Sequence, residues 1–382
     1  MPTTVEVRSI PVLSGLDEAT VPPGDWEELT ACGACGEDGA LRDVVTVAGR
    51  RQAATVLAVC DRCEHAFLRR RPTQAWFDRY YAAEWDARGR SADAAETPLG
   101  RKVAGFCAPH LGERARVLDV GAGFGSQLLG FRELGHEPYG LERSEHRAAH
   151  VESLGIPCSY GPFERAELPE RLDLVYTHHV LEHTGDPELV LRRCADAVQP
   201  GGLVYVAVPN LWHEHPAQTV HFVPHLSTFT ERSLETLMAR CGLDVIARQV
   251  DRELQLLGRK TEGRARSALG PDNGFGAAVA DWLIAGFGGR PGRHLLLWWK
   301  SSDKSTVYAR EIRAARASGR LARAVALERR LPPAGRAVRA RLWPAVASRT
   351  VRSLEVDARV EGSADLPIEV RHPADEAPVW VK

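Results

Sequence analysis

The chain has 382 residues, of which 44% are hydrophobic and 26% are charged, and its formal net charge is −1. This composition is ordinary for a globular protein, and the balanced charge gives no basic field that would favour nucleic acid as a partner. No apolar run approaches the ~20 residues that a membrane span needs, and the N-terminus lacks the pattern of a signal peptide. We therefore expect a cytoplasmic protein with no membrane partner.

Residues 1–30 are expected to form an N-terminal arm, and two C-x2-C pairs follow them. The four cysteines are Cys32, Cys35, Cys60 and Cys63. Two such knuckles can bring four thiolates together tetrahedrally around one Zn²⁺. The spacing predicts a zinc ribbon over residues 31–70, and we expect its role to be structural because four thiolates leave no open coordination position. His65 is a weaker, spare ligand candidate.

Residues 71–99 are predicted to connect the ribbon to the main domain. Thr73 can cap a helix that carries a stripe of aromatic side chains. These are Trp76, Phe77, Tyr80 and Tyr81. Small and polar residues from 87 onward indicate a linker, so the main domain is expected to begin at about residue 100.

From residue 116 onward the pattern alternates between strand and helix, as βαβ units do. The expected strands are 116–120, 137–141, 158–160, 172–177, 203–208, 243–248 and 295–300, the last of them preceded by an insertion of some forty residues. Asp186 followed by Pro187 predicts a helix start, and a further helix is expected from Thr230. The sequence therefore predicts an α/β domain over residues 100–300.

The stretch 117–125 reads VLDVGAGFG and marks a ligand site at the end of the first of these strands. A glycine turn at the carboxyl end of a parallel strand lets the backbone approach a ligand closely, because no Cβ intervenes. Glu142 at the end of the next strand is placed to accept hydrogen bonds from two ribose hydroxyls. The turn departs from the G-x-G-x-x-G pattern of many dinucleotide sites, so a different nucleotide-type cofactor is expected.

Two further motifs complete a family pattern. They are DLVYTHHVLEH at residues 173–183 and PGG at residues 200–202. Together with VLDVGAGFG and Glu142, they resemble class I S-adenosylmethionine-dependent methyltransferases, most closely the ubiquinone-biosynthesis-like branch, over about residues 100–250. The N-terminal ribbon with its aromatic helix is similar to the zinc-binding segment of some sugar C-methyltransferases. The resemblance implies a Rossmann-like sheet of seven strands and S-adenosylmethionine as cofactor.

The resemblance also implies which residues hold the cofactor. They are Asp119, Gly121, Ala122, Gly123, Gly125, Glu142, Phe163, Glu164 and His178. Asp119 would orient the turn and the cofactor amine, and Glu142 would hold the ribose. Phe163 and Glu164 would flank the adenine, with Glu164 in place of the aspartate that is usual in this turn.

Histidines crowd the same end of the predicted sheet, and histidine is suited to accept a proton near neutral pH. The candidate catalytic residues are His178, His179 and His225. Glu182 and His183 are expected to cap and pack the following helix. A metal that holds the substrate is an alternative use of the loop residues His213, Glu214, His215 and His221, and Trp212 in that loop is a candidate lid.

Residues 301–382 are predicted to form a C-terminal extension. Residues 303–352 have a basic, Ala- and Leu-rich pattern that favours helices, either packed on their own protein or facing an acidic partner. From residue 353 the chain alternates in hydrophobicity, which indicates a small β appendage.

We expect the chain to move a methyl group from S-adenosylmethionine to a small molecule with histidine-assisted proton removal. The acceptor would be a sugar or another natural-product intermediate, free or attached to a carrier protein. Three alternatives stay open: an RNA methyltransferase, a transfer of another alkyl group or a cyclisation from the same cofactor, and a cofactor-binding interaction module without turnover.

Overall fold

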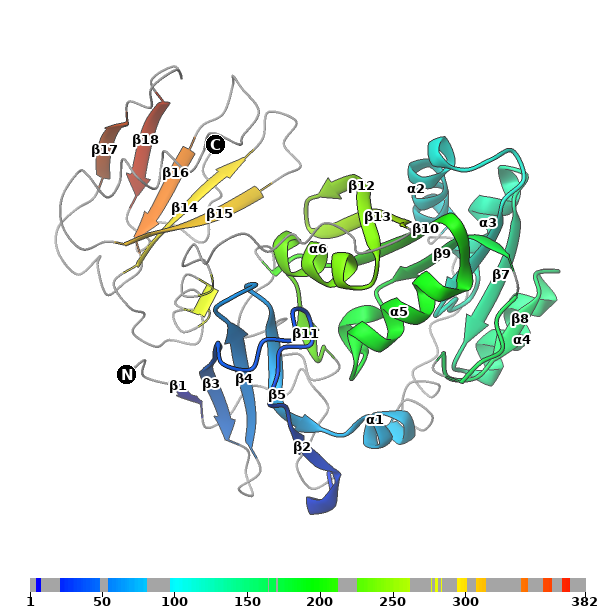
Figure 1. Cartoon of the computed structure of the whole chain (residues 1–382), viewed down its shortest axis with the longest axis horizontal. Helices are drawn as coiled ribbons and strands as arrows, with labels where there is room; N and C mark the ends of the chain where they lie inside the picture. Colours follow the sequence, from blue (N-terminus) through cyan, green and yellow to red (C-terminus); the bar gives the residue numbers. More distant parts are fainter. Residues whose placement is uncertain are drawn as a thin grey trace.

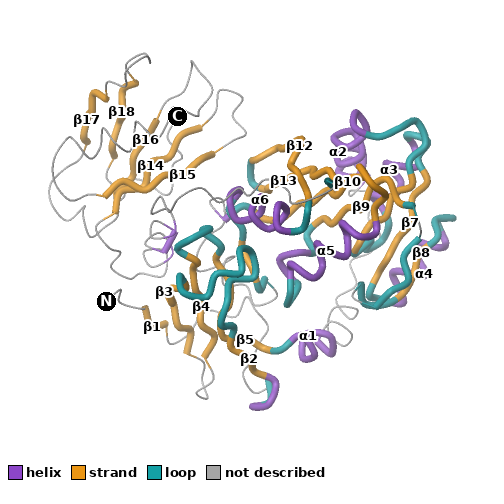
Figure 2. Tube along the Cα trace, in the orientation of Figure 1, coloured by secondary structure: helices purple, strands orange, loops and turns teal. Residues whose placement is uncertain are grey.

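The computed structural model describes residues 21–48, 54–80, 97–163, 165–169, 171–211 and 225–261, together with Val5–Val7, four residues between 276 and 283, and five strands between 294 and 371. These residues form three sheets (Figure 1). The central one is interleaved with helices, whereas the other two are built mainly from strands (Figure 2). None of the described helices is long and apolar enough to cross a membrane.

The central sheet has seven strands in the order β12-β13-β10-β9-β6-β7-β8. Their bounds are β6 Arg116–Val120, β7 Glu137–Glu142, β8 Cys158–Tyr160, β9 Leu172–His178, β10 Val198–Pro209, β12 Leu243–Val250 and β13 Glu253–Lys260. The five strands from β10 to β8 run parallel, and β13 runs antiparallel to both of its neighbours. The predicted Rossmann-like sheet is confirmed, and its first six strands lie where the sequence pattern predicts them.

The predicted seventh strand at 295–300 is wrong. Strand β13 is the seventh strand instead and lies between β12 and β10, because the chain turns back at Asp251 and Arg252 directly after β12 and pairs with β10. A tight turn of this kind joins antiparallel strands, and no insertion is needed. Strand β14 (His294–Lys300) pairs with other C-terminal strands in a separate sheet.

Helices cover both faces of the central sheet. Their bounds are α2 Thr97–Cys107, α3 Ser126–Glu133, α4 Glu145–Ser153, α5 Pro187–Ala197 and α6 Glu231–Arg240. Buried side chains of α2, α3 and α4 pack with one set of alternate strand residues, and those of α5 and α6 pack with the other set. Both predicted helix starts are confirmed: the Asp186 side chain accepts from Leu189 N, and Thr230 forms a capping box with Ser233.

The N-terminal sheet incorporates a strand from the second half of the chain. Its members are β1 Val5–Val7, β2 Trp26–Glu28, β3 Leu41–Ala48, β4 Ala54–Cys60, β5 Ala66–Pro72 and β11 Ser227–Thr228. Strand β11 pairs antiparallel with β5, so the segment around the cysteines is joined by hydrogen bonds to the chain that follows β10. Helix α1 (Gln74–Tyr80) follows β5 as predicted, and Thr73 Oγ1 accepts from the amide of Trp76.

The C-terminal extension forms a five-stranded sheet in the order β15-β14-β16-β18-β17. The new strands are β15 Val307–Arg313, β16 Val338–Leu342, β17 Ser353–Ala358 and β18 Leu366–Arg371. The predicted β appendage is confirmed by β17 and β18. The prediction of basic helices is wrong where the structure describes this segment, because its described residues form β15 and β16. In β16, apolar and charged residues alternate with the period of a strand.

Candidate cofactor pocket and cysteine cluster

The glycine turn between β6 and α3 forms a cradle for a ligand. Gly121, Gly123 and Gly125 have φ of +82°, +55° and +77°, values that L side chains rarely adopt. A Cβ on Gly121 would lie 2.6 Å from Val180 Cγ2, whereas a Cβ on Gly123 would meet nothing within 4 Å. Both glycines line the pocket, so a Cβ on Gly123 would project into space that a ligand can use.

Glu142 closes the cradle from the end of β7. Its Oε2 accepts from Gly123 N at 2.7 Å, and its Oε1 accepts from the amides of Arg143 and Ser144 at 2.9 Å each. The carboxylate therefore ties the glycine turn to the loop after β7. Glu142 lies in the pocket wall, where the sequence pattern places an acid for a ribose.

The pocket wall contains some of the predicted cofactor residues and several that the sequence reasoning missed. The lining residues are Gln74, Asp78, Val120, Gly121, Gly123, Leu141, Glu142, Arg143, Ser144, Arg147, Gly161, Phe163, His179, Val180, His183, Thr184 and Val190. Of the predicted set, Asp119, Ala122, Gly125 and His178 are not among them, and Glu164 lies outside the described residues. Gln74 and Asp78 come from α1, so no motif of the main domain points to them.

Asp119 lies under the glycine turn, with only 2% of its surface exposed. Its Oδ2 accepts from the hydroxyl of Tyr176 at 2.7 Å, and burial raises the pKa of Asp119 to about 8. The Asp119 side chain thus links the end of β6 to β9 by a buried hydrogen bond. The contact with a cofactor amine that the resemblance implies stays a prediction.

His179 holds the loop after β9 between two carboxylates. Its φ is +55°, Nδ1 lies 3.0 Å from Glu182 Oε1, and Nε2 lies 2.9 Å from Glu253 Oε1. Burial alone would lower the pKa of His179, but the hydrogen bonds to the two carboxylates outweigh it and raise the pKa to about 10. At neutral pH His179 is therefore an imidazolium cation that links the loop to β13.

Of the other histidines, His178 and His225 stay neutral, and His183 lines the pocket. Burial lowers the pKa of His178 and of His225 to about 4. His178 Nε2 has no hydrogen-bond partner among the described residues. The ring of His225 packs edge-on against that of His183 at 4.8 Å, and His183 lines the pocket. The predicted candidates in the loop, Trp212, His213, Glu214, His215 and His221, lie outside the described residues.

The charge on His179 predicts that stability falls in alkaline solution. In the unfolded chain a histidine titrates near its ordinary pKa of ~6.5, whereas the folded state holds the pKa of His179 at about 10. Its stabilising contribution is complete below the unfolded pKa and is lost as the pH rises through the folded pKa. We expect the free energy of unfolding, measured by urea titration, to decline between about pH 7 and pH 10 more steeply in wild type than in His179→Gln. His110→Gln, at an exposed histidine, is the control and should match wild type; equal slopes in all three proteins would contradict the assignment.

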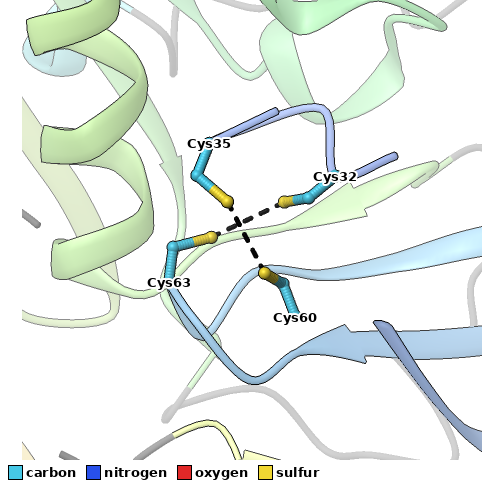
Figure 3. Close-up of side chains that lie close together, drawn as sticks. All are labelled: Cys32, Cys35, Cys60 and Cys63. Atoms are coloured by element: carbon cyan, nitrogen blue, oxygen red, sulfur yellow. Dashed lines mark hydrogen bonds between the residues drawn. The ribbon is translucent and has the colours of Figure 1, made fainter. Parts of the chain in front are cut away.

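The four predicted metal ligands lie together between the N-terminal strands and α6 (Figure 3). Sγ of Cys32 lies 3.5 Å from that of Cys63, Sγ of Cys35 lies 3.5 Å from that of Cys60, and all four atoms are within 4.8 Å of one another. A tetrahedral zinc site with Zn–S of ~2.3 Å places its sulfurs about 3.8 Å apart. Contacts with Cys32 and the other two sulfurs lower the pKa of the Cys35 thiol far below its ordinary value. The donor set therefore fits a zinc ion.

His65 lies beside the cluster as a neighbour of one ligand. Its Nδ1 is 3.5 Å from Cys32 Sγ, and its fully buried ring stacks between Phe67 and Phe229. Such a ring can hydrogen-bond to a ligand sulfur and orient it. The four sulfurs already supply the four ligands of a tetrahedral site. The described structure therefore supports His65 as a neighbour of the ligand Cys32.

Residues 77–248 match a family model described as a methyltransferase domain. The sheet order, with its single antiparallel strand β13, and the glycine cradle at the end of β6 fit a Rossmann-like class I methyltransferase fold. This part of the chain is therefore similar to class I S-adenosylmethionine-dependent methyltransferase domains. The fold class and the presence of a methyltransferase domain, both expected from the motifs, are thereby confirmed.

Two curated proteins that resemble this chain have the same name. The ubiquinone biosynthesis O-methyltransferase of Rhizobium rhizogenes is 31% identical over 155 residues, which are 36% of this chain and 62% of that protein. The protein of the same name from Proteus mirabilis is 37% identical over 103 residues, which are 25% of this chain and 42% of that protein. The chain thus spans less than two thirds of the length of these curated relatives.

Solved structures with a similar fold include two methyltransferases. Magnesium protoporphyrin IX methyltransferase from Synechocystis, with bound S-adenosylhomocysteine, is 11% identical with a TM-score of 0.40 and covers 49% of this chain and 100% of that one. The CcbJ methyltransferase from Streptomyces caelestis is 18% identical with a TM-score of 0.38 and covers 43% of this chain and 90% of that one.

Proposed function

We propose that this protein transfers a methyl group from S-adenosylmethionine to a small-molecule acceptor. The observation that carries the proposal is the pocket formed by the glycine cradle and Glu142, because a Cβ on Gly123 would occupy space that a ligand can use. The printed name of the curated relatives, ubiquinone biosynthesis O-methyltransferase, supports the same acceptor class. Bound S-adenosylmethionine supplies an activated methyl group on its sulfonium sulfur.

The pocket residues can hold the nucleoside part of this cofactor. A carboxylate oxygen has two lone pairs, and Glu142 Oε2 accepts one hydrogen bond from the described residues, so it can accept another from a ribose hydroxyl. Phe163 offers an apolar ring for the adenine and is held from behind by Arg193, whose Cζ lies 5.3 Å from the ring centroid. Glu164 keeps its predicted role as an acceptor from the adenine amine.

On the acceptor side we propose different roles for the histidines. Methyl transfer is an in-line displacement, so most of the acceleration comes from positioning the acceptor, and a neutral base removes its proton where that is needed. His183 lines the pocket and His225 packs against it, so this pair is placed to receive the proton. His178 is neutral but does not line the described pocket, and His179 is already protonated, so these two position the loop.

We also propose a structural zinc ion in the cysteine cluster. The four sulfurs satisfy the ligand number and geometry of a closed site, and such a site leaves no open position for a substrate. The residues that would hold the ion are the four cysteines, with His65 beside Cys32.

Glu142→Gln is expected to weaken the binding of S-adenosylhomocysteine by about 30-fold, the size of effect that follows from removing an acceptor for charged hydrogen bonds. The amide group would oppose the backbone N–H groups that the carboxylate now accepts. Isothermal titration calorimetry measures the affinity directly. Glu145→Gln, at an exposed acid in the next helix, is the matched control. An affinity of Glu142→Gln equal to that of the control would contradict the ribose role.

The acceptor class is tested by tracing a labelled methyl group. The protein is incubated with methyl-labelled S-adenosylmethionine and either a small-metabolite extract or total RNA. We expect label in a small molecule and S-adenosylhomocysteine as co-product. Label in RNA alone would favour the RNA methyltransferase, methylthioadenosine as co-product would favour transfer of another group, and label carried on a protein-sized species would show a carrier-bound acceptor.

A further inference from the structure

One wall of the cofactor pocket comes from outside the methyltransferase core. Gln74 and Asp78 line the pocket, and both belong to α1, which follows β5 of the N-terminal sheet. The wall that they face contains Glu142 and the glycine turn. The segment that carries the cysteines thus contributes side chains to the pocket.

Two side chains of this segment hold the backbone of Gly185. Its N–H donates to Gln74 Oε1 at 2.8 Å, and its carbonyl oxygen accepts from Arg71 Nη2 at 2.5 Å. Arg71 is almost fully buried and also pairs with Glu27 of β2 at 2.7 Å. A Cβ on Gly185 would lie 2.6 Å from Gln74 Oε1, so a larger residue at this position would displace the end of the Gln74 side chain. Gly185 directly precedes Asp186, the capping residue of α5. The hydrogen bonds to Gly185 therefore hold α1 against this side of the pocket.

Asp78 continues the contacts toward the ribose side. Its Oδ1 accepts from Gln74 Nε2 at 2.9 Å and from Arg143 Nη1 at 2.6 Å. The amide of Arg143 in turn donates to Glu142 Oε1. A chain of polar contacts therefore crosses the pocket from Gly185 through Gln74, Asp78 and Arg143 to the acid at the end of β7.

The cysteine knuckles are packed on the same elements. Gly33 lies against Pro187, the first residue of α5. A Cβ added to Gly33 would lie 3.4 Å from Pro187 Cγ. The carbonyl oxygen of Ala34 accepts from Arg240 Nη1 at 3.1 Å, and Arg240 also pairs with Glu188 of α5. The knuckles and α1 thus both contact the N-terminal end of α5, the knuckles at Pro187 and, through Arg240, at Glu188, and α1 at Gly185.

From these contacts we propose that α1 is a cofactor-binding element, in which Gln74 and Asp78 position Arg143 beside the ribose of S-adenosylmethionine. In this proposal zinc binding by the four cysteines favours cofactor binding in the pocket, and because a coupling between two sites is reciprocal, cofactor binding then strengthens zinc binding. This inference rests on the proposed function, since the nucleoside is the ligand that α1 would cover.

The first test compares two substitutions on α1 in the full-length, zinc-loaded protein. Asp78→Asn removes the charge that holds Arg143, whereas Arg79→Gln breaks the exposed pair between Arg79 and Asp25. We expect Asp78→Asn to raise the Kd for S-adenosylhomocysteine about tenfold, and Arg79→Gln to leave it unchanged. Equal affinities of the two single variants would overturn the role of α1.

The second test measures the linkage from the side of the metal. Zinc release from wild type to a colorimetric chelator should slow severalfold when S-adenosylhomocysteine is saturating, and Asp78→Asn should reduce this protection. Zinc release at an unchanged rate in wild type that binds S-adenosylhomocysteine would overturn the linkage and leave the proposed function standing. Wild type that binds no S-adenosylhomocysteine would overturn the proposed function itself.

Discussion

Gly121→Ala is expected to reduce the affinity for S-adenosylhomocysteine by more than about 100-fold and to destabilise the fold, because overpacking and left-handed strain each cost ~1–3 kcal/mol. The residue has φ of +82°, and an added Cβ would lie 2.6 Å from Val180 Cγ2. Neither atom is the far end of a flexible side chain, so the turn or the Val180 loop must move. Both line the pocket, and the movement therefore changes the shape of the cradle.

The matched control is Gly135→Ala. Gly135 has a similar φ of +87° after the end of α3, but an added Cβ there would meet nothing within 4 Å, and the residue does not line the pocket. This variant carries the backbone strain without the steric contact. Calorimetry of S-adenosylhomocysteine binding and thermal unfolding of both variants separate the two effects. Two equally weakened affinities would mean that the turn does not shape the cofactor site.

The core of the fold could be predicted because its signals are local. The apolar strand before the glycine turn, the acid at the end of β7 and the caps at Asp186 and Thr230 all act within a few residues of where they stand. The cysteine pairs could be predicted for a similar reason, since each knuckle is a tight turn and only the pairing of the two knuckles is long-range.

The parts that escaped prediction depend on contacts between distant segments. Asp78 reaches the pocket only because Arg71 and Gln74 dock on Gly185, which lies more than a hundred residues further along the chain. The ionised state of His179 depends on Glu253, which arrives with the unpredicted strand β13. Burial and partner charges set such pKa values, and both follow from tertiary packing.

The same contacts change how the N-terminal segment is understood. A ribbon with a structural zinc ion, considered alone, is an independent small domain that needs metal to fold. Here β11 completes its sheet from the other half of the chain, and Arg240 bonds to the knuckle backbone. Loss of the metal should therefore be felt by the methyltransferase core, which makes the cysteines the most informative positions for a stability experiment.

Cys60→Ser is expected to lose the zinc ion and to lower the free energy of unfolding by several kcal/mol, since structural zinc sites contribute about 10–16 kcal/mol in zinc-finger peptides at neutral pH. Cys60 ends β4, is fully buried, and its sulfur lies 3.5 Å from that of Cys35. A serine hydroxyl is a poor ligand for zinc among thiolates, and without the ion the site would hold a buried polar group and three crowded sulfurs.

The control for this substitution is Cys107→Ser. Cys107 is also fully buried, at the end of α2, but it lies apart from the metal cluster, and burial alone raises the pKa of its thiol. It therefore reports the cost of burying a hydroxyl in place of a thiol. Zinc content by elemental analysis and unfolding by calorimetry are measured on both variants. Cys60→Ser that keeps a full equivalent of zinc, or that unfolds at the same temperature as Cys107→Ser, would show that the four sulfurs do not share a metal, and the linkage between the cluster and the cofactor pocket would then lose its basis.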